Sequence, residues 1–393
     1  MRTPALFIAG NETGYFQEAF DDDAYPHHVV RHTRIYSGDK LEISREHYLP
    51  ARNGLVTFID RLIFKSTASQ NEIKLTQYLC VTRLTINGQR FAVRLEPGQA
   101  LCLDAQGGSL NLQVAADVDC PLIVYAGNGP ARLQTSAGLA EVHLGEGNHH
   151  VIAGKGLAFI QVAHPGQVVV DGHYLKGAPG DRAVLVRNAE GDDLLAAPVP
   201  DEARTLGAEG LEVTGTDRFK QEVESYLQLL RRLPIGRTLL AALERPGRGY
   251  PVRITEQTGI GWTAYLPSTG ESDEGTHFIN NGRPGLGFSG GTLLFAPYRA
   301  GTVELPLLEL YRSLCMAWNS INGTVFRGEV RVKYRGRDID VPACELQAIG
   351  VATGLAPYAF DTEKDSIALD TNPFPFNENA LRKALDLPPF TFR

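Results

Sequence analysis

Histidines, cysteines and carboxylates are the side chains of this sequence that could bind a metal or act as a nucleophile or base. The chain has ten histidines, and all of them lie at or before His277. Some stand close together, namely His149-His150, and His27-His28 with His32. Adjacent residues of a strand point to opposite faces, so neither pair of neighbours forms a two-ligand clamp.

His28 and His32 have the spacing of a metal-binding pair on one face of a helix. Pro26 and the pair Val29-Val30 instead favour an extended chain in this segment. We therefore expect these histidines to be solvated or hydrogen-bonded surface residues.

Five cysteines are widely spaced and form no Cys-x-x-Cys pair. An odd number with this spacing predicts reduced thiols rather than a disulfide framework or a thiolate zinc site. One hypothesis makes Cys315 or Cys344 a nucleophile with His277 as its base. The alternative is that both cysteines are packing residues, which is the usual role of a cysteine on an apolar helix face.

The charge balance excludes several kinds of partner. The chain has 393 residues with a formal net charge of −7, and no clustered excess of Lys and Arg indicates a nucleic-acid site. No apolar run approaches the length of a bilayer span or the core of a Sec signal. We expect no nucleic acid partner, no membrane insertion, and no export by a Sec route.

The elements that must position these side chains divide the chain into two parts. Residues 1–190 consist of short apolar or alternating runs broken by Gly, Asn, Asp and Pro, which predicts an all-β domain. From about 123 to 176 a nine-residue repeat begins at Ile123, Arg132, Glu141, His150, Phe159 and Val168. Such a unit of strand plus glycine turn is typical of a parallel β-solenoid or β-roll without calcium. A β-sandwich remains the alternative.

Residues 191–211 are the predicted linker, and residues 212–393 are predicted to form an α+β domain. Apolar spacing predicts helices over 217–233, 237–243 and 305–321, with Gly323 just past the last of these. Segments 250–255 and 291–296 resemble strands, and 344–351 is a short helix or strand. Asn377 is a plausible N-cap for a helix over 378–385.

Four short pieces of this second part resemble the NleD-type zinc metallopeptidases, a family of bacterial type III effectors. They are the segments Leu233-Pro234-Ile235-Gly236-Arg237-Thr238-Leu239-Leu240, Ala317-Trp318-Asn319-Ser320-Ile321-Asn322-Gly323-Thr324, Glu345-Leu346-Gln347-Ala348-Ile349-Gly350 and Asn377-Glu378-Asn379-Ala380-Leu381-Arg382. The resemblance covers somewhat under half of the chain. It implies a zincin-like fold for residues 212–393.

In that family a His-Glu-x-x-His helix holds Zn²⁺ through two histidines, while the glutamate activates the bound water. Aligned on Ala317 and Trp318, these places are Arg312, Ser313 and Met316 here. Glu345 matches a downstream acidic position expected to supply a third ligand. One carboxylate cannot hold catalytic zinc, so the resemblance implies a degenerate site with no metal and no cofactor. We expect Arg312 to form a salt bridge with Glu345, and Met316 to fill the apolar wall.

Three functional hypotheses follow. The first is a catalytically inactive metallopeptidase-like effector or toxin-related protein that acts by binding a protein partner. The second is a hydrolase with a non-zinc site around Cys315, Cys344, His277 or Glu345. The third is a β-domain that binds glycan or protein and is joined to a purely structural C-terminal domain.

Overall fold

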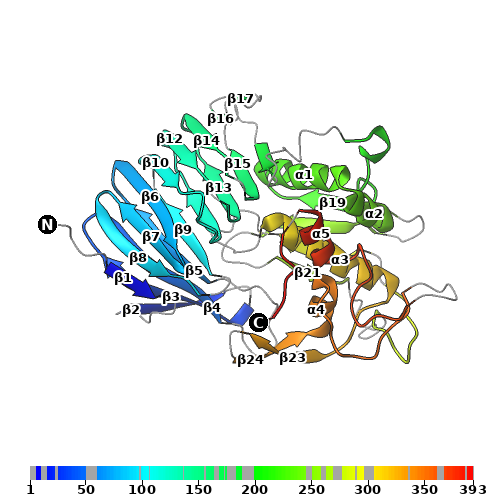
Figure 1. The fold of residues 1–393 in the computed structure, drawn as a ribbon. Helices are drawn as coiled ribbons and strands as arrows, with labels where there is room; N and C mark the ends of the chain where they lie inside the picture. Colours follow the sequence, from blue (N-terminus) through cyan, green and yellow to red (C-terminus); the bar gives the residue numbers. More distant parts are fainter. Residues whose placement is uncertain are drawn as a thin grey trace.

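The computed structural model describes residues 6–9, 16–22, 25–49, 60–96, 99–105, 107–135, 137–154, 156–162, 168–171, 173–174, 183–187, 199–244, 250–257, 263–268, 277–287, 290–295, 305–334, 337–360, 367–385 and 387–392. Its first part is built from strands and its second part from helices around a smaller sheet (Figure 1). No helix within the described residues is long and apolar enough to cross a membrane.

The first part contains two sheets of nine strands each. Sheet A has the order β1-β8-β7-β6-β10-β12-β14-β16-β17, with bounds Leu6–Ala9, Gln89–Arg94, Val81–Ile86, Gln70–Tyr78, Ser109–Val114, Ala131–Gln134, His149–Ile152, Val168–Val170 and His173–Tyr174. Sheet B has the order β18-β15-β13-β11-β9-β5-β4-β3-β2, with bounds Ala183–Arg187, Ala158–Val162, Ala140–Leu144, Leu122–Tyr125, Ala100–Asp104, Asp60–Ser66, Leu41–Leu49, Tyr25–Ser37 and Phe16–Asp22.

The nine-residue repeat is half of one coil of a parallel β-solenoid. Successive units alternate between the two sheets, so each strand pairs in parallel with the strand two units away. Leu122 pairs with Ala140 in sheet B, and Ala131 pairs with His149 in sheet A. The prediction of parallel stacking is therefore confirmed for this region. The strands begin at or one residue before the predicted starts, and β17 turns back antiparallel to β16 near the end of the predicted repeat.

Antiparallel strands close both ends of the parallel stack. Strands β3, β4 and β5 pair antiparallel in sheet B, and β6, β7 and β8 do so in sheet A. At the other end β18 adds antiparallel to β15, and β17 to β16. Solenoids need such atypical terminal units because an open parallel edge would present unpaired backbone groups.

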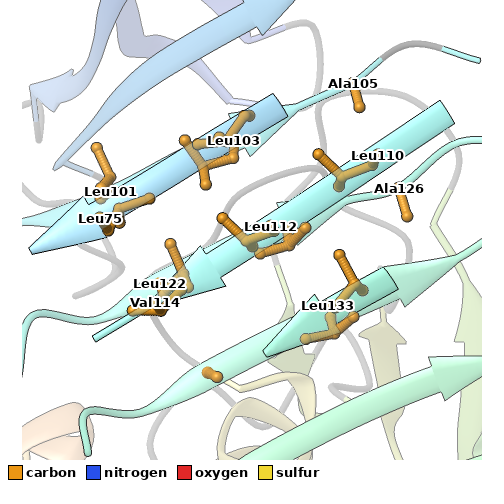
Figure 2. Close-up of a cluster of buried hydrophobic side chains, with 14 of the residues drawn as sticks. Leu75, Leu101, Leu103, Ala105, Leu110, Leu112, Val114, Leu122, Ala126 and Leu133 are labelled. Atoms are coloured by element: carbon orange, nitrogen blue, oxygen red, sulfur yellow. The ribbon is translucent and has the colours of Figure 1, made fainter. Parts of the chain in front are cut away.

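The interior of the solenoid is filled by aliphatic side chains from alternate positions of both sheets, as period-two burial requires. Figure 2 shows part of this cluster, in which Leu103 and Leu122 of sheet B lie near Leu112 and Leu133 of sheet A. Glycine is required where coils approach most closely: a Cβ on Gly129 would lie 2.3 Å from the carbonyl oxygen of Gly108, and one on Gly156 would lie 2.0 Å from that of Gly138.

The second part has a four-stranded sheet with the order β19-β20-β22-β21. Strands β19 (Leu211–Thr214), β20 (Val252–Glu256) and β22 (Thr292–Phe295) are parallel, and β21 (Ala264–Leu266) is an antiparallel edge. A hairpin of β23 (Glu329–Tyr334) and β24 (Arg337–Pro342) stands apart from this sheet. The second part therefore contains both helices and a small mixed sheet.

The helices are α1 (Asp217–Arg232), α2 (Pro234–Leu243), α3 (Pro306–Asn322), α4 (Ala343–Ile349) and α5 (Glu378–Ala384). Each overlaps a predicted segment. Helix α2 begins three residues before its predicted start, since Pro234 occupies the first helical position, where its missing N–H costs nothing. The segment whose type was left open is helical as α4.

The predicted linker lies partly outside the described residues, which resume at 199. A 3₁₀ turn, η2 (Asp201–Ala203), follows, and its Ala203 is buried. The Leu206 carbonyl accepts a hydrogen bond of 2.8 Å from Arg231 Nε of α1. Residues 199–211 thus pack against the second part rather than spanning a gap.

The two parts contact each other through β15 and α1. The Phe159 ring stacks on Tyr226, with centroids 6.0 Å apart, and Gln161 Nε2 donates to the Tyr226 hydroxyl at 3.2 Å. Phe159 belongs to the same apolar cluster as α1, α2 and α3. The outward face of sheet B is thereby covered along β15.

Candidate functional site

Helix α3 carries Arg312, Ser313 and Met316, the three residues that the resemblance aligns with the zinc motif. It lies at the centre of the second part, in contact with α2, α4 and α5. Pro306 starts the helix, and Gly323 ends it in the left-handed conformation (φ 69°). Arg312 and Ser313 are buried, while Met316 is half-buried at the edge of the apolar cluster. The four segments that carry the family resemblance come from α2, α3, α4 and α5, and so they meet around α3.

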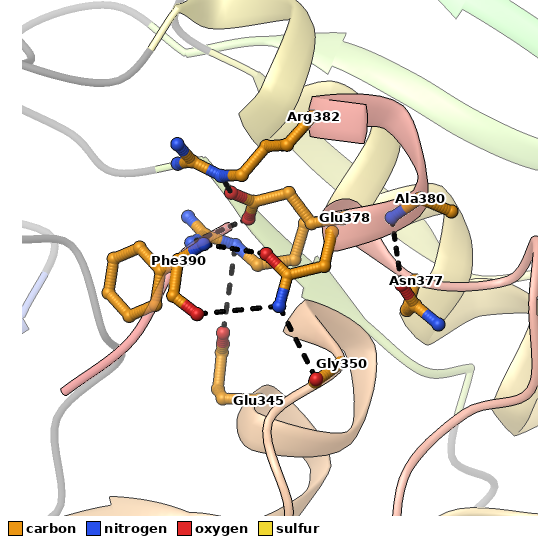
Figure 3. Close-up of polar contacts among 9 residues, drawn as sticks. Glu345, Gly350, Asn377, Glu378, Ala380, Arg382 and Phe390 are labelled. Carbon is orange, nitrogen blue, oxygen red and sulfur yellow. Dashed lines mark hydrogen bonds and ion pairs between the residues drawn. The ribbon is translucent and has the colours of Figure 1, made fainter. Parts of the chain in front are cut away.

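Arg312 forms the expected salt bridge with Glu345. Its Nε lies 3.8 Å from Glu345 Oε2, and the two side chains are each 4% exposed. Its Nη1 lies 3.3 Å from Glu378 Oε2, and Glu378 Oε1 accepts a 2.5 Å bond from Arg382 Nε. Figure 3 shows Glu345 of α4 beside Glu378 and Arg382 of α5. Three helices therefore supply one buried ionic cluster, here called the Arg312 cluster: Arg312, Glu345, Glu378 and Arg382.

Opposing effects act on the pKa of the buried Glu345 in this cluster. Burial raises the pKa of Glu345, Arg312 opposes that rise, and the neighbouring Glu378 and Glu309 add to it. Glu309 is itself buried in the first turn of α3, where its Oε2 accepts a 2.7 Å hydrogen bond from the Thr263 hydroxyl. Arg312 is thus the cation that lets several buried carboxylates coexist.

The Arg312 cluster does not fit a zinc ion. A guanidinium cannot ligate a metal, and neither Met316 nor Ser313 offers the imidazole or carboxylate that the resemblance would require at its position. Within the described part of the chain, no group of three or more His, Cys, Asp or Glu residues is arranged to hold a metal. No chemical step that needs a bound metal is therefore assigned to this site.

Residues next to the cluster fix its helices. Gln347 of α4 donates from Nε2 to the Thr324 carbonyl at 2.7 Å and accepts from the Phe326 amide at 3.0 Å, tying α4 to the chain after α3. Asn377 accepts from the Ala380 amide, which confirms it as the N-cap of α5. Asn379 holds the C-terminal segment through the Phe390 backbone. These bonds give structural roles to residues of the resembling segments.

The thiols are not activated. Cys315 lies within α3, and burial raises its pKa well above the ordinary range. Burial likewise raises the pKa of Cys344, in α4, to about 12. A nucleophilic cysteine needs a lowered pKa and access. Burial also lowers the pKa of His277, whose carbonyl accepts from the Val325 amide. These environments favour packing roles and give the hypothesis of a cysteine nucleophile no support.

The histidines of the solenoid form no clamp. His149 is buried, with Nε2 3.2 Å from the Gly145 carbonyl, and burial lowers its pKa. His150 is half-buried on the opposite face of β14, as alternation predicts. His28 and His32 lie in strand β3, which rules out a helical pair. The side chains of His27 and His28 lie outside the described residues.

Sequence reasoning missed Glu378 and Glu309 as members of the charged core. Glu378 has no exposed side-chain surface, although in the sequence it stood out only as the first residue of the helix that Asn377 caps and as part of a resembling segment. Its signal was the Glu378 and Arg382 spacing of four residues, which pairs them on one helix face. Glu309 stands three residues before Arg312, the other helical spacing.

A scan against known protein families, a search of curated proteins and a search of solved structures each find no match for this chain.

Proposed function

We propose that this protein is a metal-free, catalytically inactive metallopeptidase-like effector that acts by binding a protein partner. The observation that carries the proposal is the Arg312 salt bridge with Glu345. It supports the proposal because Arg312 stands where the resemblance would put a zinc ligand, and its guanidinium lies against the residue that the resemblance aligns with an acidic ligand.

The fold around that pair supports a zincin-like assignment. A mixed sheet with one antiparallel edge strand precedes a central helix, and a second helix brings Glu345 to it. Arg312 and Met316 are four residues apart, the spacing of the two histidines in His-Glu-x-x-His. Function resides in the site and stability in the core, so a fold can persist after its catalytic groups are lost.

Restoring the motif tests the assignment. The variant Arg312→His/Ser313→Glu/Met316→His supplies two imidazoles and a base beside Glu345. We expect it to bind one zinc per chain, measured by elemental analysis after gel filtration, and to lose it when Glu345→Gln is added. The same triple change placed one residue further on, at Ser313, Leu314 and Ala317, is the matched control.

If the folded restored variant, checked by circular dichroism, binds no more zinc than this control, α3 is not a former zinc helix. A second experiment uses the unaltered full chain and so does not depend on folding of the variant. Cross-linking should recover a protein partner intact, and peptide-bond cleavage of that partner by the unaltered chain would contradict an inactive binder.

A further inference from the structure

The outward face of sheet A carries a surface that the proposed function does not use. Strands β6, β7, β8, β10, β12 and β14 alternate between buried and outward residues over most of their length. The second part covers sheet B along β15, whereas sheet A lies on the far side of the solenoid (Figure 1). The outward side chains of β6, β10, β12 and β14 form rows across the strands because these four strands pair in parallel register.

This face is basic on an acidic protein. The outward positions of these strands hold five cations, Lys74, Arg83, Arg90, Arg94 and Arg132, against the single acid Glu72. The whole chain has a net charge of −7. Such an asymmetry between one face and the whole attracts an anionic ligand to that face.

Polar side chains line two adjoining hollows on the same face. One, of about 580 Å³, lies over β6, β10 and β12, and its polar lining includes Glu72, Asn111 and Arg132. The next lies over β10, β12 and β14 and shares Asn111 and Arg132, adding Gln113 and Gln134. Register places Asn111 opposite Arg132, and Arg132 opposite His150. A groove lined by amides, cations and the acid Glu72 therefore crosses the strands.

The donors of this groove are available. Within the described residues, no side-chain hydrogen bond or ion pair engages Arg132, Gln113 or Gln134. Lys74 pairs only with Glu72 at 3.1 Å, and both side chains are more than half exposed, so the pair is weak. Guanidinium, ammonium and amide groups facing solvent together suit a ligand that carries both carboxylates and hydroxyls.

Backbone groups of these strands are already used in the parallel ladder, so an extended peptide cannot add to this face as a strand. Bases of a single-stranded nucleic acid would need aromatic platforms. Two exposed aromatic side chains stand at this face in the described strands, Tyr78 of β6 and Phe7 of β1. Arg83 already lies over Tyr78, 5.3 Å from the ring centroid, and Phe7 lies on the edge strand, outside β6, β10, β12 and β14. Strands about 4.8 Å apart repeat their donors at the scale of one sugar unit in an extended glycan.

We propose that the outward face of sheet A binds an acidic oligosaccharide, with Arg132 and Lys74 contacting carboxylates and Asn111, Gln113 and Gln134 contacting hydroxyls. The chain of sugars runs across β6, β10, β12 and β14. This site is independent of the Arg312 cluster and stands whether or not the second part is a former peptidase.

Calorimetric titration of the full chain with hexagalacturonate and with neutral cellohexaose tests the site. We expect binding of the acidic sugar only, weakened by salt at roughly 0.5 M, where exposed charges are screened. Arg132→Gln should weaken it about tenfold or more, since a charge-assisted contact is lost. Arg331→Gln, which removes the same charge from an exposed residue of β23, is the matched control and should change nothing.

All these side chains face solvent, so the variants should keep the melting temperature of the parent. No binding of hexagalacturonate, or equal loss in Arg331→Gln, overturns the proposal. Equally tight binding of oligothymidylate or polyglutamate with the same dependence on Arg132 also overturns it, because the face would then be a general anion surface.

Discussion

The solenoid and the helical part of the chain bury different kinds of side chain in their interiors. In the solenoid, aliphatic side chains such as Leu103 and Leu122 stack on similar residues one coil away, so each contributes a modest, repeated increment. In the helical part, Arg312 and three carboxylates lie among apolar residues, and each depends on particular partners. Stability should therefore be spread evenly along the solenoid and concentrated at a few residues in the helical part.

The largest effect is expected from Arg312→Met. Removing the cation leaves Glu345 buried without its partner, and breaking a buried ion pair costs about 3–5 kcal/mol. Urea unfolding of the full chain, followed by tryptophan fluorescence, to which Trp318 of α3 contributes, measures the change. Adding Glu345→Gln should recover part of the loss. A change below about 1 kcal/mol would show that the charged core is not a point of concentrated stability.

A single coil contact in the solenoid should matter less. Gly156→Ala places a Cβ against the Gly138 carbonyl, and such overpacking costs about 1–3 kcal/mol. Thermal unfolding followed by far-ultraviolet circular dichroism reports it, with the outward-facing Gln134→Ala as control. If Gly156→Ala proves more harmful than Arg312→Met, the contrast between the two regions is wrong.

The pH dependence of Glu345 sharpens the contrast further. Because burial raises its pKa above the ordinary value of 4.5, the folded state holds the proton that the unfolded state releases. Ionisation of Glu345 therefore does not affect the free energy of unfolding below pH 4.5, and it lowers that free energy as pH rises from 4.5 through the raised pKa.

Glu345→Gln removes the titrating group. Its stability relative to the parent chain should therefore increase as pH rises from about 4.5, by less than the effect of Gly156→Ala. Denaturant midpoints measured across that range check the sign. A parent chain that gains stability over the variant with rising pH would mean that Arg312 lowers the Glu345 pKa overall.

The smallest effect is expected at an exposed pair in the same part of the chain. Arg253 Nε lies 3.1 Å from Glu212 Oε2 across β19 and β20, with both side chains about half exposed. Such pairs contribute about 0–1 kcal/mol, so Arg253→Gln should leave the urea midpoint nearly unchanged. A loss approaching that of Arg312→Met would show that burial is not what distinguishes the two pairs.

The same contrast explains what the sequence could predict. The stacking of the solenoid was predictable because the nine-residue repeat recurs in every unit. The helices were predictable from apolar spacing, from Pro306 and from the caps Asn377 and Gly323. The Arg312 and Glu345 pair was predictable because both stand at aligned motif positions. The burial of Glu378 and Glu309 was not predictable. Which carboxylates enter a buried cluster depends on how three helices pack against one another, and no local sequence pattern specifies that packing. The start of α2 was predicted three residues late, because proline breaks the interior of a helix but also occupies the first helical position, as Pro234 does.

The sequence also did not predict that the outward face of sheet B is covered along β15 while that of sheet A is not. Phe159 and Arg132 stand at equivalent places of the repeat, yet one is buried against Tyr226 and the other faces solvent. The repeat specifies which residues point outward, and only docking of α1 on β15 decides which outward residues are buried.

The most direct test of the central claim is the zinc content of the unaltered full chain, purified without chelator in the presence of zinc and compared with Glu345→Gln. With Arg312 paired to Glu345, we expect far less than one zinc per chain in both proteins. One tightly bound zinc per parent chain that disappears in Glu345→Gln would contradict the account, because the ion would then occupy the place assigned to the guanidinium.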